Sequence, residues 1–268
     1  MVRTLAALTA RVDQSPRMQP WLEAGMWGGL AGSALLLGAA IGYSVRLPKA
    51  VLAGVMAFGS GVLLSALSFE LMEEAYQQAG FVPVAAGFFG GSLLYSGANW
   101  WLSKRGGKGR KRSSKDAADA AADDDSGTAI AVGALLDGIP ESMAIGLTLL
   151  AGGGVSLPTV VAIFISNIPE GLSSSAGMRA QGRSARYVFS LWAGIAVCSS
   201  AAAIFGYAVC GEFSPQTQAA ITAVAAGGIL SMLAETMMPE AYEGAHDYAG
   251  FITCAGFAAA FALSMGSA

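Results

Sequence analysis

Eight runs of about 20 apolar residues, separated by polar segments, dominate this 268-residue sequence. A helix of that length spans the hydrocarbon core of a bilayer. The runs are continuous and rich in Ala, Leu and Gly, whereas strands of membrane barrels alternate apolar and polar residues. The sequence therefore predicts an all-α, polytopic membrane protein with eight transmembrane helices, at 21–43, 50–72, 81–102, 128–151, 157–178, 187–210, 216–238 and 248–265.

The composition supports this class and excludes several others. Charged residues make up 12% of the chain, against about 25% in soluble domains. A net charge of −3 provides no basic surface for nucleic acid. His246 is the single histidine, so a His-Glu-x-x-His zinc protease is excluded, and the sequence contains no Gly-x-Ser-x-Gly nucleophile motif. We therefore do not expect an enzyme.

The basic residues predict the orientation of the chain in the membrane. Twelve of the fifteen Lys and Arg lie in the first, third and fifth connections, and the other three lie in the N-terminal tail, 1–20. Cytoplasmic loops carry an excess of basic residues. We therefore expect these three connections in the cytoplasm and both termini outside the cell membrane.

The third connection, 103–127, separates helices one to three (21–102) from the fourth and fifth helices (128–178) and the last three (179–268). Its composition is basic at first and then rich in Ala and Asp, which predicts a flexible cytoplasmic loop. The basic half is suited to contact with anionic lipid. A weak regulatory metal site at Asp123, Asp124 and Asp125 is the alternative interpretation.

Acidic residues lie inside the predicted spans, although no Lys or Arg does. A charged side chain at the bilayer centre costs about 2.5–3.5 kcal/mol on insertion scales. With no basic partner at that depth, such acids are protonated, line a wet cavity or bind a cation. Each of these is a functional interpretation. For a single acid, the alternative is a neutral carboxyl group that is hydrogen-bonded to the backbone.

The acids of the fourth and fifth spans lie in a repeated Ile-Pro-Glu motif. Its two copies, in 136–144 and 165–173, are 29 residues apart. Residues i and i+4 share a helix face, so an acid or hydroxyl lies one turn before each glutamate. Each proline removes a backbone donor and frees a carbonyl, so we expect two kinked helices around a central site. The expected ligands of a divalent cation are Asp137, Glu141, Ser166, Asn167 and Glu170.

These motifs, the eight spans and the long third connection resemble the ZIP (Zrt/Irt-like) family of metal transporters over the whole chain. The stretch Ser166-Asn167-Ile168-Pro169-Glu170-Gly171 is similar to the family's fifth span, and 234–240 is similar to its His-Glu-x-x-Pro-Glu stretch. The resemblance implies uptake of zinc, iron or manganese into the cytoplasm by alternating access. It also implies a homodimer and a transport site at Asp137, Glu141, Ser166 and Glu170, with Asn167 peripheral.

The sequence departs from the family pattern at its nitrogen ligands. Asp137 and Ala234 stand where the family has histidine, Gly138 where it has asparagine, and Ser166 where it has histidine or glutamine. We therefore expect one metal site at most. Oxygen ligands suit manganese, magnesium and iron, whereas imidazoles suit zinc.

Further acids lie near the ends of the second and seventh spans. Glu235, Glu240 and His246 would lie near the cytoplasmic exit, and Glu70, Glu73 and Glu74 near the outer entrance. A solvated helix end is the alternative for both sets. Glycines in spans two and three are candidates for a sliding contact or for tight static packing: Gly59, Gly61, Gly87, Gly90 and Gly91.

Two other functions fit the same sequence features. The buried acids would equally serve a proton-coupled carrier of an organic solute, and the missing histidines would fit a transport-inactive relative of the family. The expected partners are the metal ion, as substrate, and membrane lipid. No resident cofactor is expected.

Overall fold

The computed structural model describes residues 18–45, 47–104, 126–151 and 154–267, and these ranges are almost entirely helical, with no strand among them. The predicted N-terminal tail and third connection, with Asp123, Asp124 and Asp125, lie largely outside the described residues. The main helices are α2 (Pro20–Ser44), α3 (Lys49–Ala66), α4 (Glu73–Ala79), α5 (Phe81–Leu102), α7 (Ser126–Thr148), α8 (Leu157–Ala180), α9 (Ala185–Ala208), α10 (Pro215–Met232), α11 (Met238–Ala245) and α12 (Ala249–Ser267).

The all-helical prediction is confirmed, and the membrane prediction is supported in part. Five helical runs among the described residues are long and apolar enough to cross a membrane: Pro20–Ser44, Lys49–Ala79, Phe81–Leu102, Ala185–Glu212 and Pro215–Gly266. The last run contains two of the predicted spans. The helices α7 and α8 cover the other two predicted spans but are not among these five runs. The count of eight spans therefore stays a prediction.

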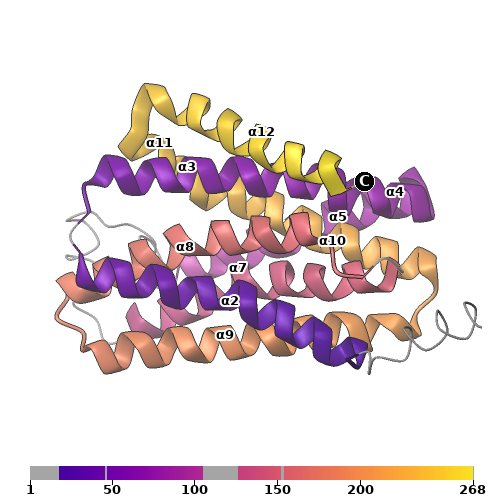
Figure 1. Cartoon of the computed structure of the whole chain (residues 1–268), viewed down its shortest axis with the longest axis horizontal. Coiled ribbons are helices and arrows are strands. Elements are labelled where there is room, and N and C mark those ends of the chain that lie inside the picture. The colour runs from indigo at the N-terminus through magenta and orange to yellow at the C-terminus, as the bar shows by residue number, and fades with distance from the viewer. Residues whose placement is uncertain (1–17, 46, 105–125, 152–153, 268) are drawn as a thin grey trace, which may run out of the picture.

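We divide the described helices into two groups by their contacts (Figure 1). In the first group, α2 packs against α8 and α9, and α9 packs against α7. In the second group, α3 packs against α11 and α12, and α5 packs against α10. The segments Leu67–Met72 and Leu233–Met237 join these two parts, since the first contacts α10 and the second contacts α3. The boundary between them is formed mainly by α3 against α8 and by α10 against α7. The two helices with the Ile-Pro-Glu motifs, α7 and α8, thus lie between the two groups.

Glycine allows close backbone approach between α2 and α8 of the first group. A Cβ atom at Gly38 of α2 would lie 2.1 Å from the carbonyl oxygen of Ile168, and one at Gly171 of α8 would lie 2.2 Å from that of Leu35. Small residues are typical of membrane helix interfaces because they let backbones approach. The Pro169–Glu170 segment of α8 is therefore held directly against the backbone of α2.

Both long acid-bearing helix runs of the second group contain a π-helical segment. The segment η1 (Leu67–Met72) connects α3 to α4, and η5 (Leu233–Met237) connects α10 to α11. The two segments lie within a sequence repeat, since seven of thirteen residues are identical between 64–76 and 230–242. Insertions of this kind occur frequently at functional sites. Here the two segments contain Glu70 and Glu235.

Candidate functional site

The three acids of the repeated motifs are buried in the interior of the bundle. Asp137 and Glu141 of α7 are each 1% exposed, and Glu170 of α8 is 7% exposed. The two polar residues that precede Glu170, Ser166 and Asn167, are also buried. The helices α7 and α8 continue without interruption through Pro140 and Pro169, so the kinks there stay predictions.

Each of three residues in this interior has a hydrogen bond that positions its side chain. The hydroxyl of Tyr95 on α5 donates to Oδ1 of Asp137 at 2.5 Å. The amide Nδ2 of Asn167 donates to the carbonyl of Ala31 on α2 at 3.0 Å. The Ser166 hydroxyl donates to a carbonyl of its own helix, three residues back. The amide of Asn167 thus connects α8 to α2, whereas Tyr95 connects α5 to α7.

No group of three or more His, Cys, Asp or Glu close enough to hold a metal occurs among the described residues. A cation bound at this site would therefore also need neutral oxygen ligands, from hydroxyl, amide or backbone carbonyl groups. Pro169 lacks an N–H, so the carbonyl of Ile165, four residues earlier, loses its helical partner. A Cβ at Gly59 of α3 would lie 3.7 Å from this carbonyl oxygen and 3.4 Å from Cα of Ser166. This carbonyl therefore lies at the boundary between the two helix groups.

The predicted entrance acids separate into two positions. Glu70 accepts hydrogen bonds at 2.6 Å from Ser156, at the start of α8, and at 2.6 Å from Ser264 of α12. Glu74 lies close enough to Glu70 for their charges to interact. Glu73 is exposed, faces a different groove and accepts a hydrogen bond from Gln77, one turn along α4.

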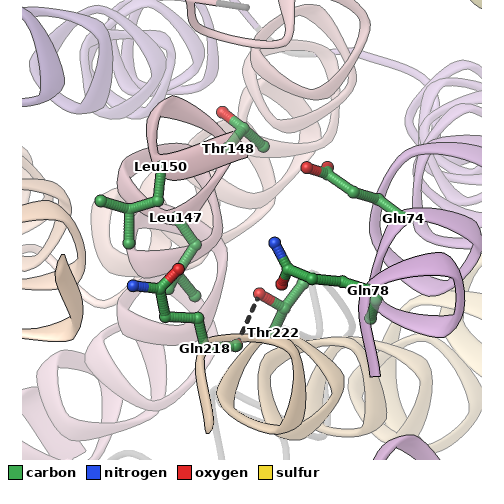
Figure 2. A pocket seen from close by; sticks show the side chains of 8 residues that line it. Glu74, Gln78, Leu147, Thr148, Leu150, Gln218 and Thr222 are labelled. Carbon is green, nitrogen blue, oxygen red and sulfur yellow. Dashed lines mark hydrogen bonds between the residues drawn. The ribbon is translucent and has the colours of Figure 1, made fainter. Parts of the chain in front are cut away.

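A small polar cavity lies beside Glu74 (Figure 2). Its volume of about 10 Å³ is enough for about one water molecule. Figure 2 shows the side chains of Glu74 and Gln78 reaching from α4 toward Thr148, at the end of α7, and toward Thr222 on α10. The cavity is therefore lined by both helix groups. It lies at the C-terminal end of α7, where Thr148 is two turns from Glu141.

The predicted exit residues also separate. Glu235 of η5 accepts hydrogen bonds from Ser96 and from Asn99, whose Nδ2 lies 2.7 Å away, and both donors are on α5. Glu240 lies farther along, on α11. His246 is exposed in the turn before α12, has a positive φ of 44°, and its ring lies edge-on to Tyr242.

Sequence reasoning missed the donors on α5. Ser92, Tyr95, Ser96 and Asn99 occur at positions i, i+3, i+4 and i+7, which form one face of a helix. A polar stripe on an otherwise apolar helix is a signal that this face meets polar groups of neighbouring helices. The repeat of 64–76 at 230–242 was a second signal, since it places two acid-bearing helices in corresponding positions.

The chain was also compared with known proteins. No model of a known protein family matches it, and no curated protein matches it.

Proposed function

We propose that this chain transports a divalent metal ion across a membrane, toward the cytoplasm. The observation that carries the proposal is the burial of Asp137, Glu141 and Glu170 at 1%, 1% and 7% exposure, on helices whose predicted spans contain no Lys or Arg. A charged side chain at the centre of a bilayer costs about 2.5–3.5 kcal/mol on insertion scales. Binding a cation during function offsets that cost.

The chemistry of the site favours a hard cation. Its candidate ligands are carboxylate, hydroxyl, amide and carbonyl oxygens, and no imidazole lies on α7 or α8. Manganese and magnesium prefer such ligands, whereas zinc prefers nitrogen and sulfur. One or two carboxylates with neutral oxygens suffice for a cation of this kind. We therefore expect uptake of Mn²⁺ or Fe²⁺ to exceed uptake of Zn²⁺, within the metal class that the ZIP resemblance implies.

The arrangement of the acids supports alternating access. Glu70 and Glu74 lie toward one end of the bundle, near the start of α8, and Glu235 lies near the end of α5. The buried acids lie between them along the boundary of the two helix groups. Movement of one group against the other would open this boundary first toward one end and then toward the other.

The decisive experiment measures metal uptake into vesicles that contain the purified chain. Glu141→Gln and Glu170→Gln keep the side-chain volume but remove the charge, and we expect each to reduce Mn²⁺ uptake at least tenfold. Glu212→Gln changes an exposed glutamate outside these helices and should leave uptake unchanged. Undiminished uptake in both buried variants would exclude the site. A chain that moves protons but no metal would favour the proton-coupled carrier instead.

A further inference from the structure

The contact between Tyr95 and Asp137 lies in the interior of the bundle. Both side chains are buried, at 3% and 1% exposure, and the donor and acceptor oxygens are 2.5 Å apart. A hydroxyl that donates to a buried carboxyl oxygen satisfies that oxygen. The bond therefore holds Oδ1 of Asp137 in one direction.

The contact also crosses the boundary between the helix groups. Tyr95 lies on α5, in the second group, and Asp137 lies on α7, in the first. The neighbouring hydroxyl groups on the polar face of α5 have partners in their own helix group. Ser92 bonds Ser231 on α10, and Ser96 bonds Glu235, so both contacts stay within the second group. Among these three hydroxyl groups, Tyr95 has the contact that spans the boundary.

We propose that Tyr95 is a positioning residue for cation transport. In one arrangement of the helix groups its hydroxyl orients Asp137 as a ligand, and in the other arrangement this hydrogen bond is broken. The inference rests on the proposed function. A bound ion shifts a conformational equilibrium only by as much as its affinities for the two states differ. A hydrogen bond anchored on one group to a ligand on the other supplies such a difference, because relative movement breaks it.

The size of the effect follows from known metal sites. Groups that hydrogen-bond a metal ligand fix its orientation, and their removal typically costs 10–100-fold in metal affinity or activity. Tyr95→Phe removes the hydroxyl and keeps the ring that packs in the core. We therefore expect this variant to raise the half-saturating Mn²⁺ concentration by about 10–100-fold.

The test measures Mn²⁺-dependent stabilisation of the full chain in detergent, and the Mn²⁺ concentration for half-maximal uptake into vesicles. Ser92→Ala is the matched control, since it also removes an α5 hydroxyl that bonds a neighbouring helix; its half-saturation should stay within about twofold of wild type. Asp137→Asn is combined with Tyr95→Phe. If Tyr95 acts through Asp137, the double variant should be no weaker in Mn²⁺ binding than Asp137→Asn alone.

The outcomes separate the two proposals. If wild type binds Mn²⁺ and Tyr95→Phe stays within twofold of it, the role of Tyr95 is wrong while the proposed function stands. Fully additive effects of Tyr95→Phe and Asp137→Asn would likewise exclude a positioning role. If no divalent ion stabilises or enters through wild type, the proposed function fails, and the role of Tyr95 fails with it.

Discussion

At the scale of single residues, three of the acids accept hydrogen bonds from neutral donors. Asp137, Glu70 and Glu235 all accept hydrogen bonds from hydroxyl or amide groups on other helical segments. A hydroxyl or amide lowers the cost of burying a carboxylate but leaves the net negative charge in place. A neutral donor of this kind is thus compatible with the cation binding proposed above.

Glu70 provides a direct test of how much such bonds stabilise the fold. Glu70→Ala removes the acceptor of the Ser156 and Ser264 hydroxyl groups. The start of α8 and α12 then lose the carboxyl group that connects them. We expect the free energy of unfolding to fall by about 1–3 kcal/mol, measured by thermal unfolding in detergent. Glu73→Ala, three residues away on an exposed face, should change it by less than about 0.5 kcal/mol. Equal effects from the two variants would contradict this role of Glu70.

The sequence singled out three acids as candidate site residues but did not predict their hydrogen-bond partners. Asp137, Glu141 and Glu170 stand out because a carboxylate in an apolar span is costly wherever the helix faces. The partners Tyr95, Ser96 and Asn99 do not stand out one by one, because a hydroxyl in an apolar helix often bonds its own backbone. Their role depends on which face of α5 meets α7 and α10, and packing sets that face.

At the scale of helices, the ends were predictable where local chemistry sets them. The predicted span 81–102 coincides with α5, because Gly80, at φ 74°, ends the preceding helix. The helix of the predicted span 50–72 continues beyond residue 72, through the π-helical η1 and through α4 to Ala79. The apolar pattern of the sequence ends at the acidic residues there, whereas the helical hydrogen bonding of the backbone continues past them.

Two adjacent glycines on α5 have different surroundings: Gly91 is closely packed, whereas Gly90 has space for a larger side chain. A Cβ at Gly91 would lie 1.9 Å from the carbonyl oxygen of Val224 on α10, whereas one at Gly90 meets nothing within 4 Å. We expect Gly91→Ala to destabilise the chain by about 1–3 kcal/mol, as overpacking does. Gly90→Ala should be neutral or stabilising by up to about 1 kcal/mol. Thermal unfolding of the two variants in detergent checks this; a harmless Gly91→Ala would contradict the tight contact.

The same distances bear on the glycines of spans two and three. Gly61 faces the backbone of Thr253 on α12, and Gly87 faces that of Ala220 on α10, both within the second group. These contacts, like that of Gly91, favour static packing over sliding between the groups. Gly59 differs from them, since it lies against α8 at ordinary van der Waals distance. Of these four glycines, Gly59 alone lies on the boundary that alternating access would have to move.

At the scale of the whole molecule, the division into two groups of helices did not follow from the sequence. The Ile-Pro-Glu repeat predicted that α7 and α8 share a function, and both lie along the boundary. Which other helices move with them depends on contacts between residues far apart in the chain, such as Asn167 with Ala31. Apolar runs of similar composition do not by themselves determine which helices pack together, because each run is compatible with lipid whichever neighbour it has.

A disulfide across the boundary tests whether the two groups move during transport. A Cβ at Gly228 of α10 would lie 3.9 Å from Cβ of Pro140 on α7, within the roughly 3.5–4.5 Å that a disulfide requires. In a background without Cys198, Cys210 and Cys254, we expect oxidation of Gly228→Cys with Pro140→Cys to stop metal uptake, and reduction to restore it.

The control disulfide lies within the first group. A Cβ at Gly32 of α2 would lie 3.0 Å from Cβ of Ser199 on α9, so this pair needs a shift of only a few tenths of an ångström to close. Because α2 and α9 belong to the same group, the oxidised Gly32→Cys with Ser199→Cys variant should keep the uptake rate of its reduced form. If complete cross-linking across the boundary also leaves uptake unchanged, transport proceeds without relative movement of the groups. In that case the coupling assigned to Tyr95 would lose its physical basis.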